Sequence, residues 1–379
     1  MHFIVLLGSA LAVSIAAERL RLPAAVLLVA AGVISGFMWH VHIPFSFGPA
    51  LMFMFLPPLI FEAAWHLDLT ELQKNALRIF GLAFPGTILT ALVVALLLSW
   101  GGILPFASAM VLGAIVAATD PVAVVAIFRV VRVPKAITTI VEAESLANDG
   151  VAVILYSIAV TLATSGAISW THDAGHGLIA IGFGSAIGAA CAFPLWLLLS
   201  STDSPEYEIT GTIALAYLAY LTADSYGFSG IFASASAAVA LRLLLRRRPH
   251  MSNRGHVQIF WDAAAYMANA VVFLATGLLI VPARILHEPA LIVCVLAMVA
   301  LVRVGLSCLV VSDIPGRLTV FLAGMRGALP LALAFSLPTQ FHDRAAIIDV
   351  VFATVLFTLV LQGGFLRVIL NRMYGSMAR

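Results

Sequence analysis

Residues 141–150 combine three carboxylates and one carboxamide in a stretch that is otherwise apolar. If this stretch is helical, Ser145 and Asp149 lie four residues apart and share a face. Glu144 and Asn148 have the same spacing and share the neighbouring face. Ser145 and Asp149 together offer the hard oxygen ligands that an alkali cation needs. Because a cation and a proton oppose each other's binding to one carboxylate, the pattern predicts that both bind alternately at Asp149.

The sequence around these acids is that of a membrane protein. The chain has 379 residues, of which 62% are hydrophobic and 10% charged, with a mean hydropathy of +1.09. Soluble domains carry roughly 25% charged residues. Thirteen mainly apolar windows predict an all-α polytopic membrane protein of about 13 transmembrane helices. The windows span residues 2–17, 23–38, 49–66, 76–100, 105–131, 136–165, 177–200, 207–225, 228–245, 257–281, 289–311, 317–337 and 345–368. Carboxylates at bilayer depth usually mark an ion or proton path.

The distribution of Lys and Arg predicts the orientation. The connections after odd-numbered windows and the C-terminal tail, together with the window ends that adjoin them, hold 16 of the 20 basic residues, whereas the opposite connections hold 2. The N-terminus is therefore expected outside and the C-terminus in the cytoplasm of a multi-pass protein of the cell membrane. A cleaved signal peptide is the alternative for the first window, but basic residues follow that window rather than precede it. The basic loop is interpreted as a topology signal rather than a nucleic-acid-binding patch; it contains Arg246, Arg247, Arg248 and Arg254.

Two windows contain helix-breaking sequences. In window 105–131, Pro121 removes a backbone donor and its ring would clash with the Ala117 carbonyl of a continuous helix. In window 317–337, glycines and a proline surround Arg326. A division of the windows into six, one and six makes these two windows counterparts in an inverted repeat, which is a transporter architecture. Ordinary proline kinks are the alternative, but the charge at each break, Asp120 in one and Arg326 in the other, favours a functional site.

The charges at the breaks have predicted roles. Broken helices place partially charged ends in apolar surroundings, so Asp120 is expected to neutralise N-terminal ends and Arg326 C-terminal ends. The Thr119 carbonyl, freed by the break, is a candidate cation ligand. Glu144 is predicted to form an ion pair with Arg326, which makes both charges tolerable in lipid. Glu62 is interpreted as a second cation-facing carboxylate, with an interfacial anchor as the alternative.

Four motifs resemble those of a known family. They are Phe61-Glu62-Ala63-Ala64, Ala118-Thr119-Asp120-Pro121-Val122, Glu144-Ser145-Leu146-Ala147-Asn148-Asp149-Gly150 and Gly324-Met325-Arg326-Gly327-Ala328. In this order they are similar to the signatures of the monovalent cation:proton antiporter 1 family, the NhaP-type and NHE-type sodium/proton exchangers.

The resemblance implies an NhaA-like fold of inverted repeats and a homodimer in which a core part slides like an elevator against an interface part. Residues 1–379 would form one membrane transport domain. Its interface part would comprise 1–75 and 201–281, its core 76–165 and 289–368, and its linker helix 166–200. The implied cation and proton site consists of Asp149, Ser145, Thr119 and Glu62, supported by Asn148, Glu144, Arg326 and Asp120.

The resemblance also implies an activity: secondary antiport of sodium, or of lithium or potassium, against protons, in the service of pH homeostasis. No cofactor, enzymatic activity or nucleic-acid partner is expected. Asn148 stands where electrogenic relatives carry a second Asp, which suggests electroneutral one-for-one exchange. The sequence departs from the family at Asp262, since relatives commonly have Glu after the equivalent of Trp261.

Two other functions remain open from the sequence. A sodium-coupled symporter of a small organic solute would use a similar inverted-repeat scaffold and would need a cavity for that solute. An intramembrane serine protease is a remote alternative, because Gly227-Phe228-Ser229-Gly230 matches a Gly-x-Ser-Gly motif. The histidines that follow it, His250 and His256, lie in a polar loop predicted on the opposite side, so no base is expected to reach Ser229.

Overall fold

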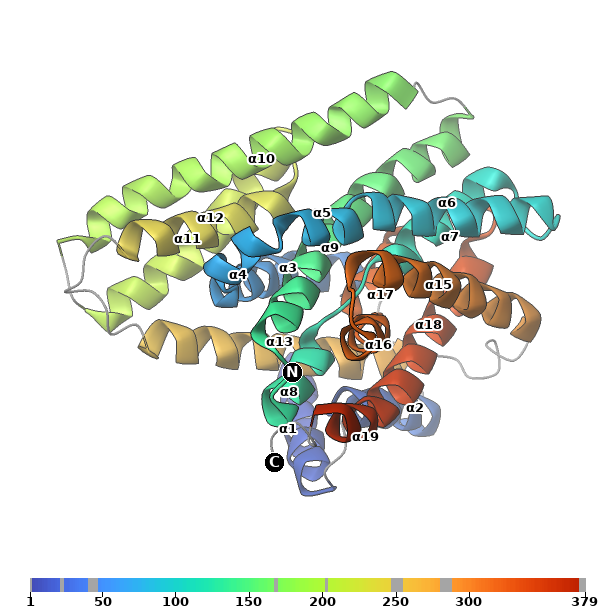
Figure 1. Cartoon of the computed structure of the whole chain (residues 1–379), viewed down its shortest axis with the longest axis horizontal. Coiled ribbons are helices and arrows are strands. Elements are labelled where there is room, and N and C mark those ends of the chain that lie inside the picture. Colours follow the sequence, from blue (N-terminus) through green and yellow to red (C-terminus); the bar gives the residue numbers. More distant parts are fainter. Residues whose placement is uncertain are drawn as a thin grey trace. The chain divides into compact units, whose positions relative to one another are not determined.

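The computed structural model describes residues 2–20, 24–39, 47–166, 170–201, 204–246, 255–279 and 288–374. Every regular element within these ranges is a helix, as the sequence predicts (Figure 1). Three arginines of the predicted basic loop, Arg247, Arg248 and Arg254, lie outside the described residues.

The helices group into two units. Unit 1 contains residues 1–49, 68–167 and 269–379, and unit 2 contains residues 50–67 and 168–268. The division into core, interface and linker parts stays a prediction. The helices of unit 1 are α1 (His2–Leu20), α2 (Ala24–Trp39), α4 (Leu69–Lys74), α5 (Ala76–Ala83), α6 (Pro85–Trp100), α7 (Phe106–Ala117), α8 (Val122–Val131), α9 (Lys135–Ser165), α15 (Pro289–Val310), α16 (Ile314–Leu322), α17 (Ala328–Ser336), α18 (Arg344–Phe357), a π-helical turn (Thr358–Gln362) and α19 (Gly363–Tyr374). Unit 2 holds most of α3 (Phe47–His66), α10 (Trp170–Leu199), α11 (Pro205–Ser225), α12 (Gly230–Arg246) and the first part of α13 (Gly255–Leu279).

Six helical stretches in the described residues are long and apolar enough to cross a membrane. They are residues 76–100, 135–165, 175–199, 255–278, 289–310 and 344–374. Each of the predicted apolar windows contains helix, and windows 105–131 and 317–337 are divided by several non-helical residues. A multi-pass helical membrane protein is therefore supported, while the total of thirteen spans stays a prediction.

The first break falls where Pro121 predicts it. Helix α7 ends at Ala117, residues 118–121 are not helical, and α8 begins at Val122. Ala118 has an extended backbone, with φ −62° and ψ 138°. Pro121 occupies the N-cap of α8, so its ring no longer meets the Ala117 carbonyl that it would strike in a continuous helix.

The second break separates α16, which ends at Leu322, from α17, which begins at Ala328. Pro330 lies in the first turn of α17, where proline is tolerated because that N–H has no partner within the helix. The two breaks are in direct contact, since the Asp120 N–H donates to the Met325 carbonyl at 2.8 Å. Both predicted interruptions are confirmed, and the inverted-repeat relation between them stays a prediction.

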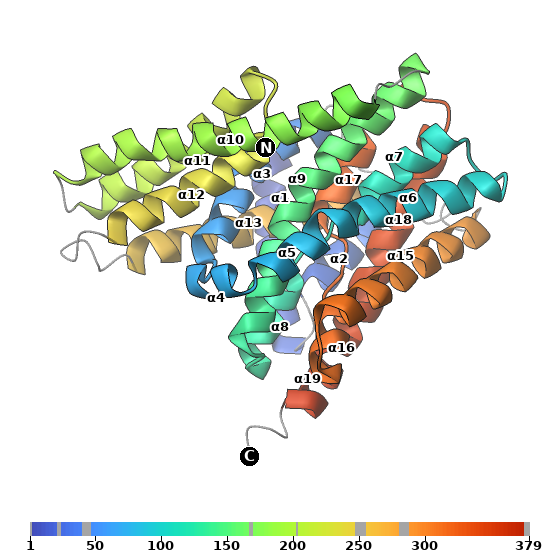
Figure 2. The ribbon, with the colours of Figure 1, turned by 45° about the horizontal axis from the view of Figure 1, so that its top comes forward.

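Close packing positions the first break within unit 1. Helices α6 and α7 lie side by side in both views, and α9 packs against α7 (Figures 1 and 2). Gly113 allows the close approach of α6 and α7, because a Cβ there would overlap the Ala91 carbonyl oxygen of α6. In unit 2, α10, α11 and α12 pack together (Figure 2). The end of α7, which leads into the break, is therefore held between two helices of its own unit.

Gly327 provides a test of the contact between the breaks. A Cβ at this position would overlap the Asp120 side chain, so we expect Gly327→Ala to destabilise the protein by about 1–3 kcal/mol through overpacking. Gly81 of α5 is the matched control because a Cβ there meets nothing within 4 Å. Gly81→Ala should leave the melting temperature of the purified protein unchanged or raised. An unchanged melting temperature for Gly327→Ala would show that the breaks do not pack in this way.

Candidate cation-binding site

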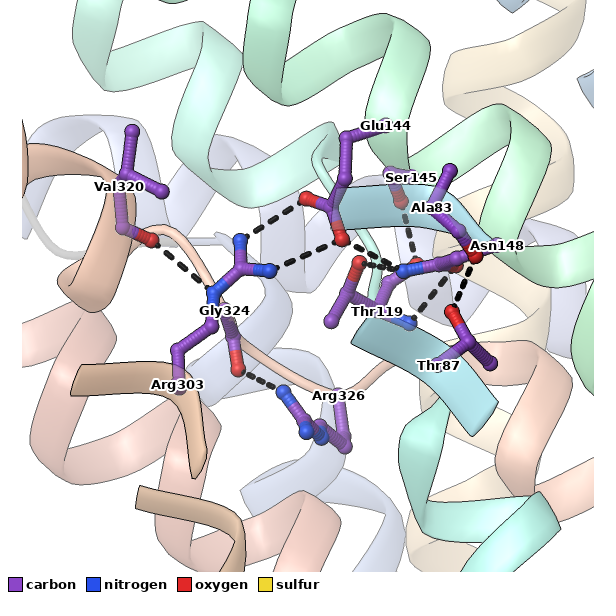
Figure 3. Close-up of polar contacts among 10 residues, drawn as sticks. All are labelled: Ala83, Thr87, Thr119, Glu144, Ser145, Asn148, Arg303, Val320, Gly324 and Arg326. Carbon is purple, nitrogen blue, oxygen red and sulfur yellow. Dashed lines mark hydrogen bonds and ion pairs between the residues drawn. The ribbon is translucent and has the colours of Figure 1, made fainter. Parts of the chain in front are cut away.

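One face of α9 holds the peptide group of Thr119 in the first break (Figure 3). The Thr119 carbonyl accepts a hydrogen bond from Ser145 Oγ at 2.5 Å. The Thr119 N–H donates to Asn148 Oδ1 at 3.3 Å, and the Thr119 hydroxyl accepts from Asn148 Nδ2 at 2.6 Å. Three of the predicted site residues, Thr119, Ser145 and Asn148, are thus brought together and buried.

Asp149 differs from these neighbours because its carboxylate is not fully paired. Its Oδ1 atom is buried and has no hydrogen-bond partner within the described part of the chain. Asp120 and Glu144 lie near enough to act on it electrostatically, and both are acids. A buried acceptor without a donor is unfavourable by about 1–3 kcal/mol. Either a proton or a cation would relieve this, so Asp149 has the properties of a group that binds one or the other.

Glu144 forms its ion pair with Arg303 of α15, and the predicted pairing with Arg326 is wrong. Arg303 Nη1 and Nη2 donate to Glu144 Oε1 and Oε2, each at 2.9 Å, in a two-pronged arrangement (Figure 3). Asn148 Nδ2 adds a third hydrogen bond to Glu144 Oε1 at 2.8 Å. Glu144 is 1% exposed and Arg303 is 7% exposed. A paired, bidentate geometry of this kind is what allows two charges to be buried together.

Arg326 instead binds backbone carbonyls at the breaks. Its Nε donates to the Val116 carbonyl at 2.8 Å, and its Nη1 donates to the Gly324 carbonyl. Its own N–H donates to Thr358 Oγ1 at 3.1 Å, in the π-helical turn. The last carbonyls of a helix have no partner within it. The guanidinium therefore supplies a hydrogen-bond donor to a carbonyl at the C-terminal end of α7. This is the position that the sequence predicted for Arg326.

Sequence reasoning missed Arg303, although a signal for it exists. Arg303 is the single charged residue of α15, a 22-residue apolar helix. An arginine in the middle of such a helix normally has a buried acidic partner. Its Nε also donates to the Val320 carbonyl at 3.2 Å, which ties α15 to α16. The sequence placed Arg303 inside a span but did not assign it a partner.

Asp120 lies at the N-terminal ends of two helices. It directly precedes Pro121, the N-cap of α8. Its carboxylate also packs against Gly327, the N-cap of α17. Helix N-termini carry partial positive charge, so a carboxylate is stabilised at this position. The structure places Asp120 where the sequence expected it.

Glu62 belongs to unit 2 and therefore to a different unit from Asp149. Within unit 2 its Oε1 lies 3.2 Å from His66 Nδ1 on the next turn of α3. His66 Nε2 lies 3.3 Å from Asp262 Oδ1 on α13. Asp262, the residue that departs from the family pattern, therefore contacts His66. Of the four predicted cation-site residues, Asp149, Ser145 and Thr119 share unit 1, and Glu62 does not.

A multi-pass helical protein with two broken helices and a charged residue at each break has the features of an ion-coupled membrane transporter. The family model described as "Sodium/hydrogen exchanger, transmembrane" matches residues 4–372. The chain belongs to the sodium/hydrogen exchanger family, which confirms the resemblance seen in the four motifs.

Relatives and solved structures agree with this assignment. The chain is 32% identical over 387 residues to the low-affinity Na(+)/H(+) antiporter NhaS1 of Synechocystis sp., covering 96% of this chain and 72% of that protein. It is 32% identical over 379 residues to the Na(+)/H(+) antiporter NhaG of Bacillus atrophaeus, covering 94% and 72%. The fold is similar to that of the sodium proton antiporter MjNhaP1 from Methanocaldococcus jannaschii, with a TM-score of 0.79, 22% identity and coverage of 96% and 98%.

Double-mutant cycles can show which arginine, Arg303 or Arg326, interacts with Glu144. Arg303→Ala leaves the Glu144 carboxylate buried without its cation, and we expect a loss of stability of about 3–5 kcal/mol. The matched control is Arg367→Ala, because Arg367 is exposed on α19 and its loss should change stability little. Thermal unfolding in detergent of the single and double variants with Glu144→Gln should give a strong 144–303 coupling and a weak 144–326 coupling. The reverse order would contradict the observed pairing.

Proposed function

We propose that the protein is a secondary antiporter that exchanges one monovalent cation, sodium in the first instance, for one proton, with Asp149 binding each in turn. The observation that carries the proposal is the buried Asp149 Oδ1, which has no hydrogen-bond partner in the described residues. The family assignment and the relatives named as Na(+)/H(+) antiporters support cation:proton exchange. Lithium and potassium are the alternative cations.

The cation would be held by oxygen atoms at the first break. Ser145 Oγ donates its proton to the Thr119 carbonyl, so the hydroxyl keeps its lone pairs for a cation. The carbonyl oxygen also has a second lone pair. With Asp149 these supply the hard ligands that suit an alkali cation. Glu62 is kept as a further proposed ligand because its motif resembles that of the family. A bound cation favours the ionised carboxylate and a proton removes that charge, so the two exclude each other.

Asn148 supports one-for-one exchange because it cannot carry a second exchangeable proton. Its carboxamide is fully used: Oδ1 accepts from the Thr119 N–H, and Nδ2 donates to Thr119 Oγ1 and Glu144 Oε1. A carboxylate would lack both donated bonds and would face the Glu144 carboxylate. One titrating acid at the site supports electroneutral transport.

Several broader properties belong to the same proposal. We propose a homodimer in the cell membrane with the N-terminus outside, in which the part that carries the breaks moves as an elevator and transport serves pH homeostasis. The protein would act as a transporter and not as an enzyme. In line with this, Ser229 Oγ accepts the Phe232 N–H at 3.4 Å at the start of α12, and His256 Nε2 lies 2.6 Å from Glu208 Oε2.

Transport in liposomes tests the proposal directly. Purified protein would be reconstituted with an internal pH dye, a proton gradient imposed, and sodium, lithium or potassium added in turn. We expect cation-dependent proton movement in the wild type. We expect its loss in Asp149→Asn, because the amide of Asn does not ionise and cannot release a proton as a carboxyl group does. Ser145→Ala should weaken apparent cation affinity while retaining exchange.

The control is Asp224→Asn, since Asp224 is an exposed acid near the end of α11 in unit 2. It should transport like the wild type. An absence of proton movement with all three cations would refute antiport and favour the sodium-coupled symporter. Exchange that persists in Asp149→Asn would remove Asp149 from the mechanism.

Asn148→Asp tests the electroneutral assignment. The substitution removes two donated hydrogen bonds and places a second carboxylate beside Glu144, so we expect a lower melting temperature as well as impaired exchange.

For the wild type, the membrane potential would be clamped with potassium and valinomycin, with sodium as the transported cation. The exchange rate should then remain unchanged. A rate that follows the membrane potential would contradict one-for-one exchange.

A further inference from the structure

A second cluster of metal-ligating side chains lies in unit 2, apart from the residues of unit 1 described above. Glu62 and His66 are four residues apart on α3 and share a face, and Asp262 comes from α13. One ligand atom from each of the three side chains lies within 4.8 Å of the others. Their side chains are 17%, 11% and 42% exposed, respectively, so the cluster is enclosed but reachable past Asp262.

The hydrogen bonding of His66 determines which ring nitrogen is available. His66 Nδ1 lies 3.0 Å from the Glu62 carbonyl oxygen. A carbonyl only accepts, so Nδ1 carries the proton and Nε2 of the neutral ring keeps its lone pair. His66 Nε2 is buried and has no hydrogen-bond partner within the described residues. This is the second-shell arrangement that commonly orients a metal-binding imidazole, with one nitrogen fixed by a backbone carbonyl and the other facing the metal.

Asp262 stands opposite this nitrogen. Its Oδ1 lies 3.3 Å from His66 Nε2, although the two do not form a hydrogen bond of good geometry. Two ligands bound tetrahedrally at about 2.0–2.2 Å from a zinc ion are themselves separated by roughly 3.3–3.5 Å. The nitrogen and the oxygen are therefore already at the spacing of two ligands of one metal ion.

The surrounding side chains hold the two helices in place. Phe61 of α3 packs against Trp261 of α13, with ring centroids 4.8 Å apart. Arg242 Nη1 donates to the Trp65 carbonyl at 2.7 Å and also to the Leu67 carbonyl, which fixes the end of α3 beside His66. Preorganised ligands of this kind lose little freedom when a metal binds.

We propose that His66 Nε2, Asp262 and Glu62 bind a divalent transition metal ion of the Zn²⁺ type, with water completing the coordination. Imidazole nitrogen combined with carboxylate oxygen suits zinc and its neighbours, whereas magnesium and calcium prefer oxygen ligands alone. Glu62 Oε1 now lies 3.2 Å from Nδ1, so its carboxylate would turn toward the Nε2 side of the ring when the metal binds.

The site has a consequence for transport that rests on the proposed function. Glu62 is proposed as a ligand of the transported cation, and a divalent metal would engage the same carboxylate. Micromolar Zn²⁺ should then inhibit exchange, and it would do so without binding at Asp149.

Metal binding can be measured without any transport assay. The full-length protein in detergent, stripped of metal, would be titrated with Co²⁺ followed by absorption spectroscopy, and the Co²⁺ would then be displaced with Zn²⁺. We expect one equivalent in the wild type and affinity about tenfold or more weaker in His66→Gln and Asp262→Asn. Asp262→Glu should bind, because it keeps the carboxylate.

The matched control is His342→Gln. His342 is exposed and its Nδ1 lies 3.0 Å from Asp343 Oδ1, so this pair also combines imidazole and carboxylate, but the described residues provide no third ligand. It should bind Co²⁺ like the wild type, and so should Asp149→Asn. Absence of a saturable equivalent in the wild type, or wild-type affinity in His66→Gln, would overturn the proposal. Melting curves of each variant show whether a loss of binding reflects unfolding, and a folded Asp262→Asn with wild-type affinity would also overturn it.

Transport assays then distinguish the proposed metal site from the proposed antiport activity. In proteoliposomes Zn²⁺ should slow exchange by the wild type and by His342→Gln, and it should slow His66→Gln much less. A wild type that binds one Co²⁺ but shows no cation-dependent proton movement would refute antiport and leave the metal site standing. Exchange that is present but indifferent to saturating Zn²⁺ would refute the inhibitory role of the metal.

Discussion

The ion pair between Glu144 and Arg303 is the interaction on which the site in unit 1 depends. Two opposite charges are buried together, and the pair is tolerable because both carboxylate oxygens receive a guanidinium donor at 2.9 Å. The same carboxylate accepts from Asn148, whose other bonds hold Thr119. A continuous chain of contacts thus runs from α15 through α9 to the first break. Removing one side chain leaves its neighbours buried and unpaired, so the stability of each contact depends on the others.

At each break, a charged side chain contacts the end of a helix at the other break. Asp120 belongs to the first break, yet its carboxylate packs against Gly327 at the start of α17, beyond the second break. Arg326 belongs to the second break, yet it donates to the Val116 carbonyl at the end of α7, before the first. Each break therefore supplies the charge that an interrupted helix of the other requires. This reciprocity explains why a negative residue stands at one break and a positive residue at the other.

Local features were predictable from the sequence, whereas partners across the fold were not. Pro121 dictated the end of α7 by a clash four residues back, and the spacing of Glu144 and Asn148 placed them on one face of α9, where they form a hydrogen bond. The sequence predicted Arg326 as the partner of Glu144, whereas the observed partner, Arg303, lies 159 residues away in sequence and meets Glu144 only in the folded chain. The approach of Asp262 to His66 is likewise a tertiary contact, which the i, i+4 spacing of Glu62 and His66 does not contain.

The contrast between Asp149 and its neighbours bears on how coupling would arise. Glu144, Asn148, Thr119 and Arg326 have well-formed partners, so removing any of these side chains would break hydrogen bonds of the network. Asp149 Oδ1 has none in the described residues, so in the proposed exchange a proton or cation would arrive and leave there without breaking the bonds of the network. Under the proposed exchange, the fixed charges around Asp149 keep the site assembled while a single carboxylate changes state. The rigidity of the network and the exchangeability of Asp149 are then two results of one distribution of hydrogen bonds.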